Sequence, residues 1–129
     1  MPAWILDSVV LIDWFCGRPG VAPYVRSMIE GEQEGAFSTI SEIELWQGLR
    51  PGEEEAHEAL LECLERVPLD RAIARRAGAL RREHGLSNLS LPDAAIAATA
   101  AVTGRRLLTR NTKHFECLTE TISIEFYTK

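Results

Sequence analysis

The chain has 129 residues, of which 46% are hydrophobic and 26% charged; this is enough apolar material for one core and argues against intrinsic disorder. We expect a single domain over residues 1–129. No apolar run approaches the roughly 18 residues that span a bilayer, and no basic residue precedes Arg18, so the start lacks the features of a signal peptide. We therefore expect a soluble, cytoplasmic protein with no membrane partner. The three cysteines are widely spaced and form no metal-ligand set, so we expect unpaired thiols that act as small apolar residues.

Charge is distributed unevenly along the sequence. The net charge is −5, but residues 71–113 hold 9 Lys and Arg against 2 Asp and Glu, whereas residues 1–70 hold 4 against 14. A chain divided in this way can present a basic surface to phosphates while it stays acidic as a whole. The alternative is that both stretches are simply solvated helix faces.

The first half of the chain alternates between strand and helix patterns. Apolar runs over residues 3–6 and 9–12 flank Asp7 and predict a first strand that is buried on both faces, as in a parallel sheet. Further along, the pattern predicts a helix over residues 22–30, a turn over 31–35, a strand over 36–40 and a helix over 42–49.

The second half continues the alternation. Apolar residues at helical spacing predict a helix over residues 53–66, and Asp70 is placed to cap a further helix that ends at His84, before Gly85. A helix over residues 93–103 and strands over 106–109 and 122–127 complete the chain. This alternation predicts an α/β fold built on a layered sheet.

Three carboxylates lie at similar places, each near an element boundary beside an apolar segment. Asp7 follows the first apolar run, Glu44 comes just after the second strand, and Asp93 opens the helix of small residues. If the strands are parallel neighbours, these acids converge at one edge of the sheet. Clustered carboxylates repel each other unless a cation joins them, and oxygen ligands without His or Cys favour Mg²⁺ or Mn²⁺ over zinc.

Each acid also has a purely structural explanation. Ser41-x-x-Glu44 has the spacing of a capping box, and an acid such as Asp93 is favoured at a helix start by the helix dipole. Asp7 can end a strand in an Asx-turn. Asp7 is the hardest to explain in this way, because its apolar flanks desolvate the carboxylate unless another group pairs with it.

Four sequence blocks, in order, resemble the VapC-like toxins of the PIN-domain family. They are Ile5-Leu6-Asp7-Ser8 with the residues up to Asp13, Glu44-Leu45-Trp46-Gln47-Gly48, Leu91-Pro92-Asp93-Ala94-Ala95 with the residues up to Ala100, and Leu108-Thr109-Arg110-Asn111 with the residues up to Phe115. The resemblance implies a three-layer α/β/α domain with a central, mainly parallel sheet. It also implies a metal-dependent endoribonuclease, the toxin component of a type II toxin–antitoxin system, with Mg²⁺ (or Mn²⁺) as cofactor.

Carried over by position, the resemblance makes Asp7, Glu44 and Asp93 the catalytic and metal-binding acids. Glu44 is preferred to Glu42 because it stands at the family's distance from a glycine. Many relatives place a further acid in the last block, where this chain has Asn111 or His114, so one metal is a safer expectation than two. Thr109 and Asn111 are expected to support the acids.

The resemblance also implies partners, namely an RNA substrate, a cognate antitoxin and a second copy of the chain in a homodimer. Arg110 and Lys113 lie beside the predicted site and are our candidates for RNA phosphate contacts. Trp14 and Trp46 suit either a partner groove or the core. His114 fits general-base catalysis less well than a surface position beside a buried Phe115, and His57 and His84 are expected to be exposed.

Two other functions remain open at this point. The absence of a fourth acid is consistent with a non-catalytic module that binds RNA or protein. A phosphoryl-handling α/β domain with Asp7 as nucleophile is the third possibility, but Val9 stands where a second acid would be expected, and no Walker motif is evident.

Overall fold

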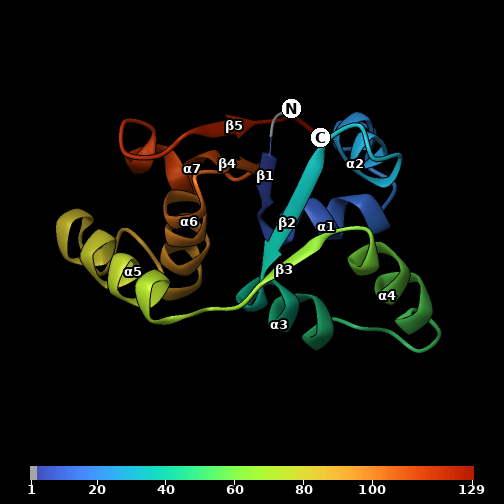
Figure 1. Cartoon of the computed structure of the whole chain (residues 1–129), viewed down its shortest axis with the longest axis horizontal. Coiled ribbons are helices and arrows are strands. Elements are labelled where there is room, and N and C mark those ends of the chain that lie inside the picture. The colour runs from blue at the N-terminus through green and yellow to red at the C-terminus, as the bar shows by residue number, and fades with distance from the viewer. Residues whose placement is uncertain (1–2) are drawn as a thin grey trace.

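The computed structural model describes residues 3–129 and contains a five-stranded sheet with the order β3-β2-β1-β4-β5. Each neighbouring pair of strands is parallel. The strands are β1 (Ala3–Leu6), β2 (Glu34–Ser38), β3 (Glu65–Val67), β4 (Arg106–Thr109) and β5 (Ile124–Phe126). β1 therefore lies at the centre, and the chain fills one side of it with β2 and β3 before it returns to the other side with β4 and β5 (Figure 1).

Helices cover both faces of this sheet. They are α1 (Ser8–Phe15), α2 (Ala22–Ile29), α3 (Thr39–Gln47), α4 (Glu54–Glu62), α5 (Arg71–His84), α6 (Leu91–Thr103) and the single turn α7 (Thr112–Phe115), with a 3₁₀ turn over Glu116–Leu118. In Figure 1, α5, α6 and α7 lie on one side of the sheet, and α1, α2 and α4 lie on the other. The α/β/α layering that the resemblance implied is confirmed.

The side chains of the central strands alternate between two cores, as the period of a strand requires. Ile5 of β1 points into the core made with α5 and α6, whereas Trp4 and Leu6 point into the core made with α1, α2 and α4. Both faces of β1 are therefore buried from solvent, which explains its continuous apolar sequence.

The strand predicted over residues 3–12 is wrong beyond Leu6. The backbone turns at Asp7, and residues from Ser8 onward form α1. Val10 and Leu11 are fully buried on the sheet, whereas Ile12 is 45% exposed, as expected for one helix crossing a sheet face. Burial against the sheet outweighs the modest β preference of this run of branched residues.

The helix predicted over residues 53–66 is too long. α4 ends at Glu62, and residues 65–67 form the edge strand β3. This strand is short and mostly exposed, so it lacks the apolar pattern by which a strand is recognised.

β2 begins at Glu34 within the predicted turn and ends at Ser38, the residue that caps α3. By contrast, α5 begins after an Asp70 cap whose carboxylate accepts from the Ile73 amide at 2.9 Å, as predicted.

Some expected exposures are also corrected. His57 is 4% exposed because α4 turns it toward α1 and α3, where its ring lies 4.0 Å from that of Phe15 and 5.9 Å from that of Trp46. The three cysteines are free, as expected, but all are exposed and so are not core residues. Val25 and Met28 belong to the core, while Trp14 and Trp46 are half-buried at its margin. None of the helices over residues 3–129 has the length and apolarity needed to cross a membrane.

Candidate functional site

The candidate site lies at the carboxyl end of β1, where the chain order of the sheet reverses. β1 is flanked by β2 on one side and by β4 on the other. The connection from β1 to β2 runs through α1 and α2, and the connection that leads into β4 runs through α5 and α6 on the opposite face (Figure 1). Such switch points are where open parallel sheets bind ligands. Asp7 follows β1 directly, and Thr109 closes β4 beside it.

Asp7 is the buried centre of this site. Its backbone amide donates to the Leu108 carbonyl at 3.0 Å, which fixes it against β4, and its side chain is only 2% exposed. The Thr109 hydroxyl donates to Oδ2 at 2.7 Å, and the Asn111 amide nitrogen lies 3.5 Å from the same oxygen. The predicted support by Thr109 is thus present as a direct hydrogen bond, whereas Asn111 is at the limit of bonding distance.

The environment of Asp7 opposes its ionisation. Burial, and to a smaller extent the charges of Asp93 and Glu44, raise its pKa to about 6 against the hydrogen bond from Thr109. Although Asp7 is the residue before α1, its side chain makes no capping hydrogen bond to the helix. The local structural explanations for this carboxylate therefore fail, and its charge is left without a cationic partner.

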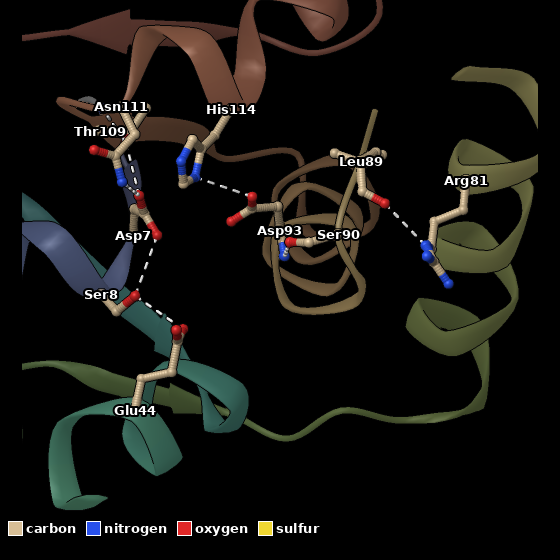
Figure 2. A network of polar contacts seen from close by, with 10 residues as sticks. All are labelled: Asp7, Ser8, Glu44, Arg81, Leu89, Ser90, Asp93, Thr109, Asn111 and His114. Atoms are coloured by element: carbon tan, nitrogen blue, oxygen red, sulfur yellow. Dashed lines mark hydrogen bonds and ion pairs between the residues drawn. The ribbon is translucent and has the colours of Figure 1, made fainter. Parts of the chain in front are cut away.

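Glu44 is joined to Asp7 by Ser8, which the sequence analysis did not single out. The Ser8 hydroxyl donates to Glu44 Oε1 at 2.9 Å and lies 3.4 Å from Asp7 Oδ1 (Figure 2). The cap of α3 is Ser38, whose hydroxyl accepts from the Ile40 amide, so Glu44 is not part of a capping box. Recognising that α1 begins at residue 8 would have placed Ser8 in the site.

Glu42 has a different surrounding from Glu44. Its carboxylate accepts from Arg66 at 2.7 and 3.0 Å and from the Trp46 indole at 3.1 Å. It is therefore held in an ion pair on the far side of the helix. Of these two acids, Glu44 is the one that the structure places beside Ser8 and Asp7.

Asp93 approaches the site from α6. Ser90 caps this helix, and its hydroxyl accepts from the Asp93 amide at 3.2 Å. Arg81 holds the preceding loop by donating to the carbonyls of Leu86 and Leu89 at 3.0 and 2.9 Å. The Asp93 carboxylate remains free of the cap and meets His114 Nδ1 at 3.1 Å (Figure 2).

Arg110 and Lys113, the two candidates for RNA contacts, differ in whether another side chain already pairs with them. Arg110 forms a two-bonded ion pair with Asp13, at 2.7 and 3.1 Å, and Tyr127 donates to the same carboxylate at 2.8 Å. Lys113 is exposed on α7, next to His114. The sequence analysis missed Asp13 and Tyr127, which are 114 residues apart and meet only in the fold.

The donor set fits a hard divalent cation in its chemistry. The carboxylates of Glu44 and Asp93 lie near the buried Asp7, whose pKa is raised to about 6, and a bound cation would relieve the repulsion among the three. Over residues 3–129, no three His, Cys, Asp or Glu side chains converge closely enough to hold an ion as they stand. Asp7, Glu44 and Asp93 are the residues that would hold such an ion.

A model of the PIN domain matches residues 4–117 of the chain. The chain belongs to the PIN-domain family. The match covers β1, β2, β3 and β4 and each of the three acids, and it ends before β5 and Tyr127. The family resemblance seen in the four sequence blocks is therefore confirmed.

Relatives of this PIN domain include proteins named ribonucleases. The chain is 33% identical to "Ribonuclease VapC19" of Mycobacterium tuberculosis over 113 residues, which cover 86% of this chain and 90% of that protein. It is 34% identical to "Ribonuclease VapC10" of the same organism over 115 residues, covering 86% and 84%.

Solved structures share the fold. A toxin–antitoxin complex from Klebsiella pneumoniae contains a chain with 31% identity and a TM-score of 0.69, covering 86% of this PIN domain and 88% of that chain. A DNA-bound VapBC from Salmonella typhimurium has 22% identity and a TM-score of 0.79, with 98% of both chains covered. At that identity, the second likeness concerns the fold alone.

Proposed function

We propose that this PIN domain is a metal-dependent endoribonuclease and the toxin of a type II toxin–antitoxin pair. The observation that carries the proposal is Asp7, a buried carboxylate without a cationic partner, which faces Glu44 and Asp93 at the switch point of the sheet. Two relatives named ribonucleases, at 33% and 34% identity, support the same activity. Mg²⁺ is the proposed cofactor, with Mn²⁺ as a substitute.

In this proposal, Asp7, Glu44 and Asp93 hold the cation and supply the negative charge that balances it. A divalent ion at this place would lower the pKa of a bound water and offset charge on the phosphate. Ser8 fixes the orientation of Glu44 through its 2.9 Å hydrogen bond, and Thr109 fixes Asp7 through its 2.7 Å bond. Such supporting bonds set the direction of the ligand oxygens.

RNA phosphates are proposed to approach from the side of α7. Lys113 is exposed there and is free to contact a phosphate. The Arg110 side chain is 26% exposed and paired with Asp13, so its contact with RNA would share the guanidinium with that carboxylate. Contacts of this kind position the strand without reading its sequence.

A cognate antitoxin is proposed to cover the pocket beside Glu44. This pocket has a volume of about 420 Å³ and is lined by apolar Ile12, Phe15 and Leu45 as well as by Glu44. The structural likeness to a chain from a toxin–antitoxin complex supports such a partner. A homodimer and a cytoplasmic location complete the proposal, on the basis of the family resemblance.

The test is cleavage of a single-stranded RNA by purified protein in Mg²⁺, Mn²⁺ or EDTA. Asp93→Asn and Glu44→Gln are expected to abolish cleavage without unfolding the chain. Asp70→Asn and Glu42→Gln are matched controls, because asparagine still caps α5 and Glu42 points away from the site. Both controls are expected to cleave like the wild type.

Other outcomes would refute the proposal. Equal cleavage by all five proteins would assign the activity to a contaminating ribonuclease. Intact RNA in every reaction, with RNA retained in a binding assay, would support the non-catalytic module instead.

A further inference from the structure

Asp13 is a second buried carboxylate, on the helix that begins directly after Asp7. Its side chain is only 3% exposed. Arg110 donates to both of its oxygens, from Nε at 2.7 Å and from Nη2 at 3.1 Å. The Tyr127 hydroxyl adds a third hydrogen bond at 2.8 Å. Three segments that are far apart in the sequence, namely α1, the turn after β4 and the end of the chain, therefore meet at this one carboxylate.

Arg110 stands between the two residues of this turn whose side chains reach Asp7. The Thr109 hydroxyl donates to Asp7 Oδ2 at 2.7 Å, and the Asn111 side-chain nitrogen lies 3.5 Å from the same oxygen (Figure 2). The Asn111 backbone amide donates to the Thr109 hydroxyl at 3.0 Å, and the Tyr127 amide donates to the Thr109 carbonyl at 3.1 Å. The direction of both side chains therefore depends on how the backbone at residue 110 is held.

A buried ion pair between Asp13 and Arg110 is poorly explained by stability alone. Moving two charges from water into the fold carries a free-energy penalty, which their attraction offsets only when the geometry is good. Apolar side chains of similar volume stabilise a fold at least as well. The guanidinium differs from them in direction, because its planar fork meets a carboxylate through two parallel hydrogen bonds. The observed pair, with one bond to each oxygen, has this directional geometry.

From this geometry we propose that Asp13 is a positioning residue for the cleavage reaction. Together with Tyr127, it holds the Arg110 guanidinium and thereby fixes the turn that directs Thr109 and Asn111 toward Asp7. The inference rests on the proposed nuclease and adds to it a residue outside the three acids. It also gives a role to Tyr127, which lies beyond the residues that the PIN-domain model matches.

An ion pair that only stabilises the fold would show the same contacts. The two explanations differ in what changes when one partner is altered in a chain that stays folded. A stabilising pair affects the free energy of unfolding alone. A positioning residue also affects kcat and the surroundings of the turn, so these are the properties to measure.

The first measurement is kcat and KM for RNA cleavage, at a temperature where unfolding curves show each protein to be folded. In Asp13→Asn we expect kcat to fall ~10–100-fold with little change in KM, on the scale of changes at groups that orient metal ligands. Tyr127→Phe keeps the ion pair and serves if Asp13→Asn does not fold, and its kcat is expected to fall by a smaller factor. Glu42→Gln is the matched control, because it breaks another two-bonded arginine pair, on α3, and we expect it to keep the kcat of the wild type.

A double variant tests whether Asp13 acts through Arg110. Arg110→Lys keeps the positive charge but cannot form the two-bonded contact. We expect Asp13→Asn to lower kcat no further when it is added to Arg110→Lys. Any direct contact of residue 110 with RNA is common to both lysine-containing proteins, so it does not affect this comparison.

Nuclear magnetic resonance of the metal-free chain gives a readout that does not depend on cleavage. In ¹H–¹⁵N spectra, we expect the Arg110 Nε–H to be protected from exchange with solvent in the wild type and in Glu42→Gln. In Asp13→Asn this protection is expected to be lost and the Asn111 backbone amide signal to move, because that amide donates to the Thr109 hydroxyl within the turn.

The outcomes separate the inference from the proposed function. Wild-type kcat in folded Asp13→Asn and Tyr127→Phe, or an Asn111 amide signal that does not move in Asp13→Asn, would overturn the inference and leave the proposed nuclease intact. Additive losses of kcat in the double variant would overturn it as well, because Asp13 would then act by another route. RNA left intact by the wild type would refute the proposed nuclease, and the positioning role with it.

Discussion

Replacing Asp7 with asparagine is expected to stabilise the metal-free protein at neutral pH, although it alters the centre of the candidate site. Asparagine has nearly the same shape, and its Oδ1 can still accept the hydrogen bond that Thr109 donates at 2.7 Å. What it removes is a carboxylate whose ionisation is opposed by burial and, less strongly, by the charges of Asp93 and Glu44. The variant therefore lacks the free-energy cost of burying this negative charge.

The size of the effect follows from the pKa of Asp7, which rises from its ordinary 3.8 to about 6 in the fold. Between these values the folded state keeps a proton that the unfolded state has lost, so the free energy of unfolding falls as pH rises. At ~1.4 kcal/mol per pH unit between the two pKa values, the wild type loses about 3 kcal/mol in all, roughly 2 kcal/mol of it between pH 4 and pH 6. The variant does not lose this energy, so the difference levels off above about pH 7.

Urea unfolding in EDTA, followed by tryptophan fluorescence at pH 4, 5, 6 and 7.5, measures this difference. Asp7→Asn should match the wild type at pH 4 and exceed it by about 2–3 kcal/mol at pH 7.5. Asp70→Asn, at the exposed cap of α5, is the matched control and should not exceed the stability of the wild type at pH 7.5. A difference that is independent of pH, or a variant less stable than the wild type at pH 7.5, would refute the reasoning.

Three further predictions concern single side chains. Tyr127→Phe removes the 2.8 Å hydrogen bond to buried Asp13, whose pKa burial would raise but the bonds from Arg110 and Tyr127 hold below its ordinary value. We expect a loss of about 2 kcal/mol at pH 7 by urea unfolding, which shrinks as the pH falls through the lowered pKa of Asp13, and an unchanged stability would contradict the prediction. Gly35→Ala places a Cβ against the Met28 sulfur, closer than real Cβ contacts come, and should cost about 1–3 kcal/mol in thermal unfolding. The double variant with Met28→Ala should lose less stability than the sum of the two single losses, and additive losses would contradict the steric cause. Ser8→Ala removes the hydrogen bond that orients Glu44 and should lower the RNA cleavage rate by ~10–100-fold with the fold retained. Cleavage by this variant at the rate of the wild type would exclude a positioning role for Ser8.

Sequence patterns gave most of the layered fold because they report local preferences. The predicted cap at Asp70 begins α5, and Gly85 lies at its predicted end, because both signals act through contacts within a few residues. β4 was predicted with its observed bounds because it is apolar and follows a clear helix stop. The first strand was extended too far because the apolar run continues past Asp7, and apolarity alone does not separate a buried strand from a helix packed on a sheet.

The approach of the three candidate acids to one another was predictable, but their surroundings were not. Asp7, Glu44 and Asp93 come from separate blocks, and the parallel sheet brings their elements to one edge, as the argument from strand ends requires. The ion pair between Arg110 and Asp13 joins residues that are 97 positions apart in the sequence, so no local pattern predicts it. The same holds for His114, whose approach to Asp93 depends on how α7 is anchored by its buried phenylalanine.

The central claim, hydrolysis of RNA at the Asp7, Glu44 and Asp93 site with a divalent ion, is tested most directly by the chemical ends of the cleaved RNA. Products of the wild type in Mn²⁺ and of Asp93→Asn prepared in parallel would be compared by mass spectrometry. Attack by water leaves a linear phosphate monoester on one product and a hydroxyl on the other. We expect these ends from the wild type alone, and no product in EDTA. Products that end in 2′,3′-cyclic phosphate, or that form equally in EDTA or with Asp93→Asn, would contradict the account.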